Sequence, residues 1–256
     1  MSTVLILNKS SECENCADRK KNAFCNLPSE EIIKIQNYIS TRKKYKEKET
    51  IYSQGENIGT VFVVKSGCLL LYNVSENGRR QILKVALPGD LVGLGRINLR
   101  NSAYGVKAIT EAELCVFSED VFKHIIRNEP NIAQRILLIL SNEVSYFQFR
   151  LLNNGQKSAR ASIASLIMEL CTKVKNQLPN LVDSKTGFCY FPLNQEGLAD
   201  SCGLTKVHVN RVLNAFKKEG LIESAHKRMR IVDKERLTRI GQFDENLFKP
   251  QQLAIH

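Results

Sequence analysis

The spacing of hydrophobic residues changes several times along this chain of 256 residues. Four isoleucines with a largely helical spacing follow Ser29, so we expect a helix that Ser29 caps. The isoleucines of its inward face are Ile32, Ile33, Ile35 and Ile39. From residue 41 to residue 117 the pattern changes to short runs rich in β-forming residues. These runs cover 61–64, 69–72, 81–85 and 114–117.

Glycines punctuate these runs at intervals of eleven or twelve residues, each near a turn signal. They are Gly55, Gly67, Gly78 and Gly89. Asn77-Gly78 is typical of a tight hairpin turn, and Gly89 lies in a second turn between Pro88 and Asp90. Evenly spaced short strands of this kind predict an antiparallel barrel or sandwich.

A longer helical pattern follows Pro130, in which apolar residues recur with spacings of 4, 3, 4, 3 and 4. We call this set the seam; it consists of Ala133, Leu137, Leu140, Val144, Phe147 and Leu151. A narrow seam at this spacing is typical of a coiled coil, which favours a dimer interface. The alternative, a helix that packs the seam on its own barrel, stays open. We expect the helix to break at Asn153, Asn154 and Gly155, which would then form a hinge.

Residues 192–222 predict two short helices joined by a tight turn at Gly203. Thr205 is suited to cap the second helix, and Gly220 to end it. Its inward face consists of Val209, Val212, Leu213 and Phe216. The segment 205–231 contains seven basic residues and two acidic ones, Glu219 and Glu223. A helix-turn-helix with a basic outer face is typical of DNA binding, although a surface helix pair without DNA remains the alternative.

Weaker patterns flank this unit. Another amphipathic helix is expected around residues 163–170, a short strand at 188–191, and a wing at 224–232. The tail, 244–256, has no pattern, so we expect it to be frayed.

Composition narrows the class of protein further. A hydrophobic content of 43% allows a large core and favours two domains. The formal net charge of +11 favours a polyanionic partner. No run approaches the length of a membrane span and no signal peptide is recognised, so we expect a cytoplasmic protein that does not bind membranes. The four histidines lie in unrelated contexts, which argues against an enzyme. They are His124, His208, His226 and His256.

Eight cysteines in such a protein are better interpreted as reduced thiols than as disulfides. Cys13, Cys16 and Cys25 lie close together near the N-terminus, among charged residues. The others lie among apolar or turn residues and look like small hydrophobic side chains.

Three segments together resemble the CRP/FNR family of bacterial transcription regulators. They are GTVFVVKSGCLLLY, LPGDLVG and QEGLADSCGLTKVHVNRVL. The resemblance covers nearly the whole chain and implies an α+β fold. That fold combines a cyclic-nucleotide-binding-type antiparallel β-roll, a long dimerisation helix and a C-terminal winged helix-turn-helix. The expected parts are a cysteine-bearing segment (1–28), the roll as sensor domain (29–130), the dimerisation helix with its hinge (131–154), the DNA-binding domain (155–237) and a tail (238–256). The implied partners are double-stranded promoter DNA, a second copy of the chain and RNA polymerase.

The family's cyclic AMP binders carry Gly-Glu and Arg-Ser pairs that hold the ribose and the phosphate. Here the first pair reads Gly93-Leu94, and the second aligns near Ser102-Ala103, without the arginine. We therefore expect no cyclic AMP, although Arg96 and Arg100 lie nearby in the sequence and keep a nucleotide effector open as an alternative.

The oxygen-sensing members resemble this chain in carrying three N-terminal cysteines and a fourth in the roll. The resemblance therefore implies an iron–sulfur site, with a 4Fe-4S cluster held by four thiolates. The ligands would be Cys13, Cys16, Cys25 and Cys115. Eight residues separate Cys16 from Cys25, more than is usual in the family. A structural zinc site, a thiol–disulfide switch of Cys13 and Cys16, and incidental free thiols remain alternatives.

The family places a glutamate and an arginine, four residues apart, over the base edges of DNA. Arg211 occupies the arginine position and is expected to read guanine, but Val207 replaces the glutamate and suits a thymine methyl. Asn210 is suited to adenine, while Lys206 and His208 are expected to contact phosphate or to be plain surface. Thr205 completes the predicted DNA-binding set.

Overall fold

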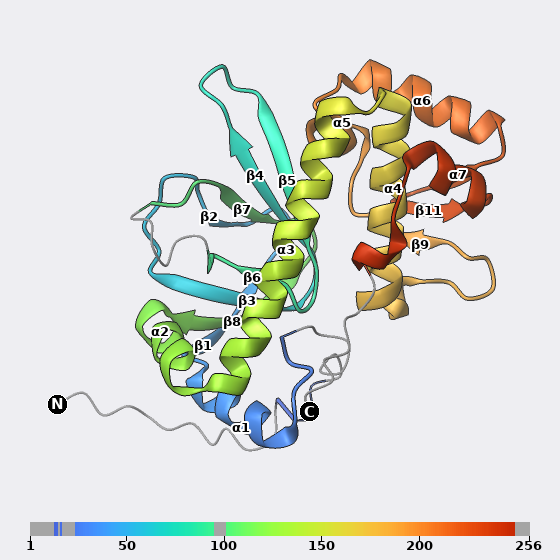
Figure 1. Cartoon of the computed structure of the whole chain (residues 1–256). Helices are drawn as coiled ribbons and strands as arrows, with labels where there is room; N and C mark the ends of the chain where they lie inside the picture. Colours follow the sequence, from blue (N-terminus) through green and yellow to red (C-terminus); the bar gives the residue numbers. More distant parts are fainter. Residues whose placement is uncertain (1–12, 15, 17–23, 95–100, 249–256) are drawn as a thin grey trace.

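A β-roll, a long helix beside it and a helical domain at the far end of that helix make up the molecule (Figure 1). The computed structural model describes residues 13, 14, 16, 24–94 and 101–248. Arg96, Arg100 and residues 249–256 of the predicted frayed tail lie outside them.

The roll consists of two four-stranded antiparallel sheets, in agreement with the predicted barrel or sandwich. The first has the order β1-β8-β3-β6, formed by β1 (Thr41–Tyr45), β8 (Ala112–Ser118), β3 (Thr60–Ser66) and β6 (Leu91–Val92). The second has the order β2-β7-β4-β5, formed by β2 (Thr50–Tyr52), β7 (Gly105–Ala108), β4 (Leu69–Val74) and β5 (Arg80–Ala86). All four predicted runs are strands. The pattern missed β1, β2, β6 and β7, because they are short or carry few apolar residues.

The expected glycine turns are present, and Gly67 shows why this residue type is needed. Its φ is +83°, and a Cβ at this position would lie 2.2 Å from the carbonyl oxygen of Glu111. The Asn77-Gly78 turn joins β4 to β5, with the Ser75 amide donating to the Arg79 carbonyl at 3.0 Å. Only glycine adopts such backbone conformations at little cost.

Three helices accompany the roll: α1 (Ser29–Tyr38), α2 (Glu119–Asn128) and α3 (Pro130–Gln156). Two details of the predicted first helix are wrong. Helix α1 begins at Ser29 itself, and Pro28 takes the capping position without a side-chain bond. Ile33 is exposed, whereas Ile32, Ile35 and Ile39 are buried. The reason is geometric, because Ile33 lies about 100° around the helix from Ile32.

The predicted break at Asn153, Asn154 and Gly155 is also wrong, since α3 continues to Gln156. Asn153 is buried, and its amide donates to the Ser165 hydroxyl at 3.0 Å. The Ser162 hydroxyl in turn donates to the Asn153 carbonyl at 2.8 Å. These contacts with the next helix engage the side-chain amide nitrogen and the backbone carbonyl of Asn153, groups that could otherwise favour a turn, so the chain stays helical.

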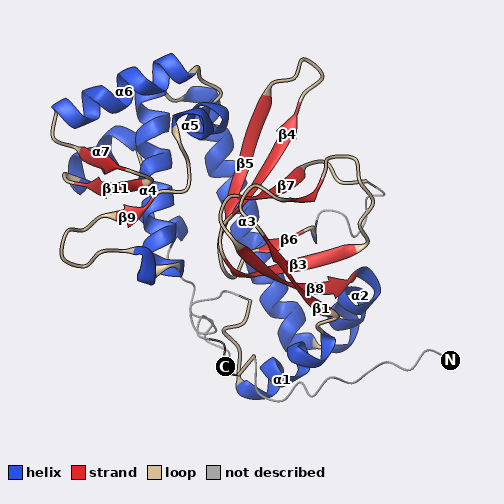
Figure 2. Ribbon diagram, turned by 180° about the vertical axis from the view of Figure 1, so that it is seen from behind, coloured by secondary structure: helices blue, strands red, loops and turns tan. Residues whose placement is uncertain are grey.

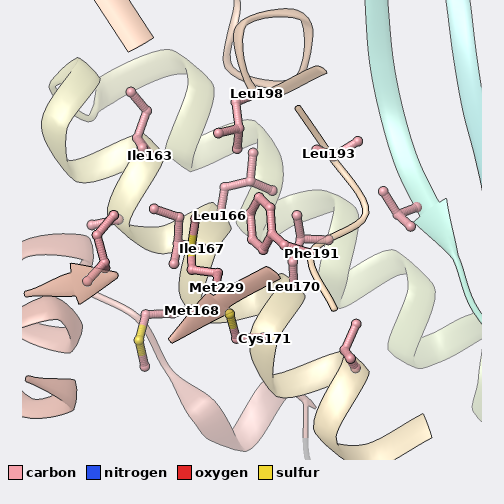
Figure 3. Close-up of a cluster of buried hydrophobic side chains, with 14 of the residues drawn as sticks. Ile163, Leu166, Ile167, Met168, Leu170, Cys171, Phe191, Leu193, Leu198 and Met229 are labelled. Atoms are coloured by element: carbon pink, nitrogen blue, oxygen red, sulfur yellow. The ribbon is translucent and has the colours of Figure 1, made fainter. Parts of the chain in front are cut away.

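The C-terminal domain is built around α4 (Ala159–Gln177). Its other elements are η3 (Pro179–Leu181), β9 (Cys189–Tyr190), α5 (Gln195–Cys202), α6 (Lys206–Lys218), β10 (Ile222–Ala225), β11 (Arg228–Ile231), α7 (Lys234–Gly241) and η4 (Glu245–Phe248). Strands β10 and β11 form the predicted wing and pair with β9 in one antiparallel sheet. Figure 3 shows α4 side chains such as Leu166 and Leu170 enclosed by Phe191, Leu198 and Met229.

Two expectations for this domain need correction. Helix α4 is not amphipathic over its middle, because every residue of 162–171 is buried. The first part of the tail is ordered, since Phe248 of η4 stacks on Phe243 at 5.0 Å between ring centroids. Phe248 also contacts Phe149 of α3, which explains why this patternless segment has a fixed place.

No helix in the described part of the chain is long and apolar enough to cross a membrane.

Candidate functional site

The recognition unit is formed by α5, a tight turn and α6, as the sequence predicts. Asn194 caps α5 by accepting from the Gly197 amide at 2.8 Å, and Gly203 adopts the left-handed conformation that ends it. Thr205 caps α6, its hydroxyl accepting from the His208 amide at 3.3 Å. Gly220, with φ +67°, follows the end of α6. Local capping signals therefore define both ends of this helix.

One face of α6 packs on α4 and α5 through Val209, Leu213 and Phe216, all buried. All six residues of the predicted DNA-binding set lie on the exposed surface: Thr205, Lys206, Val207, His208, Asn210 and Arg211. Among the described residues, no ion pair or hydrogen bond of the Arg211 side chain is found. Its guanidinium is therefore available to a ligand. Figure 1 and Figure 2 show α6 at the outer end of the molecule, beyond the C-terminal end of α3.

Two further residues join Asn210 on this surface. The Asn210 amide donates to Gln195 Oε1 at 3.4 Å, and the Asn214 amide donates to Asn210 Oδ1 at 2.6 Å. This chain of amides restricts how Asn210 can present its donor and acceptor. Asn214 could be placed from its position one turn after Asn210, but Gln195 could not, because it lies on the other helix.

The four candidate thiols come together from separate segments. Cys13, Cys16, Cys25 and Cys115 all line one cavity of about 30 Å³ between the first sheet and α1. Cys115 belongs to β8, where it lies opposite Arg42 of β1 and Val63 of β3. Spacing alone could not place Cys115 here, and only the family resemblance pointed to it.

Two cations line the same cavity, Arg42 and Lys65. Arg42 Nη2 donates to Cys13 Sγ at 3.4 Å. Burial raises the pKa of the Cys115 thiol, whereas a hydrogen bond from Arg42 and the charges of Arg42 and Lys65 act to lower it. The cations therefore favour thiolates in a site where burial opposes them.

The donor set fits an iron–sulfur cluster in kind, because four thiolates are the ligands that a 4Fe-4S cube requires. The cavity is small, since a volume of about 30 Å³ leaves space for about two water molecules. No group of three potential ligands lies close enough to hold a metal ion within the described residues. The four thiols thus line one cavity, and this cavity would have to widen to enclose a cluster.

The seam lies on an exposed face of α3, about 120° around the helix from the centre of its buried face. Its five large members, from Leu137 to Leu151, are between 36% and 75% exposed. The buried face instead carries Ile132, Ile136 and Tyr146, with the polar Arg135, Arg150 and Asn153. The described residues of the roll therefore leave most of the seam uncovered, and the alternative of a helix that packs this face on its own barrel is wrong.

Comparisons with known proteins agree with this architecture. A family model for the cyclic nucleotide-binding domain matches residues 42–129, and a model for the Crp-like helix-turn-helix domain matches residues 162–240. The transcriptional activator protein FnrL of Cereibacter sphaeroides is 30% identical over 221 residues, covering 86% of this chain and 87% of that protein. The chain belongs to the CRP/FNR family of transcription regulators. It is therefore a DNA-binding regulator rather than an enzyme.

Two further CRP/FNR proteins share less sequence with this chain. The nitrogen fixation regulation protein FixK of Bradyrhizobium diazoefficiens is 25% identical over 236 residues, which is 92% of this chain and 96% of that protein. The solved structure of FixK2 from Bradyrhizobium japonicum has a TM-score of 0.68 at 23% identity, covering 78% of this chain and 96% of that one. At this identity the structural match supports the fold alone.

Gly93 and Ser102 align with the first residues of the two pairs that hold cyclic AMP in the family's cyclic AMP binders. Gly93 lies against the first sheet, where a Cβ would be 2.9 Å from the Thr60 carbonyl oxygen. Ser102 is buried, and its hydroxyl donates to the Tyr104 carbonyl at 2.7 Å. That cyclic AMP is not the effector stays a prediction, drawn from the missing arginine.

Proposed function

We propose that this CRP/FNR regulator is an oxygen sensor that binds promoter DNA as a homodimer. Its sensing group would be a 4Fe-4S cluster on Cys13, Cys16, Cys25 and Cys115. The observation that carries the proposal is the convergence of these four thiols on one cavity beside two cations. A regulator of this kind acts in the cytoplasm, and RNA polymerase is its expected partner.

The cavity is connected to the base of α3 by a shared hydrophobic core. Phe24 precedes Cys25 directly and Leu27 follows it by two residues, and both pack in the same cluster as Ile132 and Ile136 of α3. When bound, the cluster would be the group that oxygen destabilises. The protein's part is to hold three thiols of the N-terminal segment against β8. Release of these thiols would loosen the packing of α3 and weaken the dimer.

The seam is the proposed dimer interface. Its apolar residues are exposed in the single chain, and such a surface is stabilised by a partner that covers it. Two parallel copies of α3 would place two α6 helices at the same end of the dimer. Such a two-fold arrangement would suit half-sites separated by one turn of DNA, roughly 34–36 Å.

The first experiment tests the sensing group. Protein purified without oxygen should be brown, absorb at about 400 nm and contain about four irons per chain. Cys25→Ser should abolish the colour. Cys68→Ala, which removes a buried thiol of the roll outside the cavity, should leave it unchanged. Colourless protein containing zinc, or equal colour in both variants, would show that the proposal is wrong.

The second experiment tests DNA reading in gel shifts with and without air. Arg211→Ala should lower the affinity for the operator by about 1–3 kcal/mol and relax the preference at one base. Lys217→Ala is the matched control, because it removes a cation from the last turn of the same helix. It should reduce the affinity for all sequences alike. Unchanged operator binding by Arg211→Ala would exclude the assigned role.

A further inference from the structure

The carbonyl oxygen of Ser201, in the last turn of α5, receives side-chain donors from two other parts of the molecule. Arg150 Nη2 donates to it at 2.9 Å and Asn154 Nδ2 at 3.3 Å, both from α3. Gln81 Nε2 of β5 donates at 3.2 Å. The last four carbonyls of a helix lack amide partners within it, and cations are favourable at this end. The long helix and the roll therefore both hold the C-terminal end of α5.

A second contact joins the roll to the same helix. Arg80, the first residue of β5, donates from Nε to Asp200 Oδ2 at 2.7 Å. Its Nη2 also lies 2.6 Å from Asp200 Oδ2 and 3.3 Å from Glu196 Oε1. Strand β5 lies beside α5 (Figure 2). Glu196 and Asp200 lie about one helical turn apart, so one arginine contacts two consecutive turns of α5. An arginine that engages two carboxylates constrains orientation as well as distance.

Helix α5 in turn determines the position of α6. The two helices are joined only by Gly203, Leu204 and Thr205, and they pack directly against each other. In this arrangement α6 projects beyond the end of α3, with all six residues of the DNA-binding set exposed. Any contact that fixes α5 relative to the roll therefore fixes the direction in which α6 faces DNA.

We propose that Arg80 is a positioning residue for DNA recognition, which acts through Asp200 to hold the recognition unit in its DNA-competent orientation. Arg80 does not touch DNA in this role. It raises the fraction of molecules whose α6 helix is correctly directed, and the apparent affinity follows that fraction. The inference requires only the DNA binding of the family and does not depend on what the cysteines hold.

The test is a double-mutant cycle in the full-length protein. The probe is a duplex selected from random DNA with the wild-type protein. Arg80→Ala should weaken binding about fivefold to tenfold, because the pair is partly exposed and its contribution is limited by solvent. The ratio of operator to non-specific affinity should not change, since the residues that read bases are intact. Arg79→Ala, which removes the neighbouring cation of the hairpin, should change binding less than about twofold.

Charge reversal separates positioning from general stability. Arg80→Asp and Asp200→Arg should each weaken binding, and the variant carrying both should return to within about twofold of the wild type. Thermal melting confirms that each variant is folded. The inference is wrong if Arg80→Ala behaves like Arg79→Ala, if it binds more tightly than the wild type, or if the reversed pair shows no recovery. Absence of DNA binding by the wild type would instead contradict the DNA-binding assignment itself.

Discussion

Leu151 and Leu152 are neighbours on α3. The same leucine-to-alanine substitution at each position therefore tests whether the seam is the dimer interface. Leu151 is 75% exposed and belongs to the seam, whereas Leu152 is 60% exposed and lies about 100° away around the helix. If the seam forms the interface, only Leu151 is covered by the partner. Alanine at Leu151 should therefore weaken the dimer, and alanine at Leu152 should not.

The magnitude follows from the exposed area. Leucine to alanine removes three carbon groups, each worth about 0.8 kcal/mol when buried. Scaled by the 75% exposure of Leu151, the loss is about 1.8 kcal/mol per protomer. Both protomers carry the change, so the dimer should lose about 3.6 kcal/mol, or about 400-fold in dissociation constant.

Sedimentation equilibrium over a range of concentrations, without oxygen, measures this constant directly. Both leucines are exposed in the single chain, so the folding of the protomer should change by less than about 0.5 kcal/mol in either variant. Equal dissociation constants for Leu151→Ala and Leu152→Ala would refute the assignment of the seam. A larger effect at Leu152 would place the interface on another face of α3.

Two further predictions concern stability. In urea unfolding, Gly67→Ala should destabilise the protein by more than Gly78→Ala does. Both glycines have positive φ, but only a Cβ at Gly67 meets backbone atoms. Equal losses of stability would mean that the backbone conformation alone matters. Tyr146→Phe should cost about 1–3 kcal/mol at neutral pH, because Glu169 Oε1 loses the donor that lies 2.9 Å away. Burial raises the pKa of Tyr146 well above its usual value, so the phenol stays protonated in the folded state. Its contribution to stability is complete below about pH 10 and falls above it, and Tyr146→Phe should flatten this alkaline fall relative to the wild type. An unchanged alkaline slope would contradict the assignment.

The network around Tyr146 also explains why α3 and α4 act as one support for the recognition unit. Glu169 of α4 is almost fully buried and lies 3.7 Å from Arg150 Nη1, so this charge has a partner across the two helices. Arg150 extends to the Ser201 carbonyl in the recognition unit. Buried polar groups in such a chain stabilise one relative arrangement of the helices, because any shift would leave a charge without its partner.

Predictions from the sequence succeeded where the signal is local. Thr205 and Gly220 define both ends of α6, and the alternation of apolar runs and glycine turns identified four strands of the roll correctly. The local pattern was wrong where a distant segment decides the outcome. Asn153 is a helix breaker in isolation, but its contact with Ser165 keeps α3 continuous.

The candidate functional residues also fall into two groups, those that the sequence pattern placed and those that only the fold placed. The chain by itself determined the outer face of α6 and the seam of α3, since helical periodicity assigns each side chain to a face without further information. Only the tertiary structure brought Cys115 to the cavity lined by Cys13, Cys16 and Cys25, and only it joined Arg80 to the recognition unit. These contacts connect residues far apart in the chain. They depend on how the sheets close and how the helices dock, which no short window of sequence encodes.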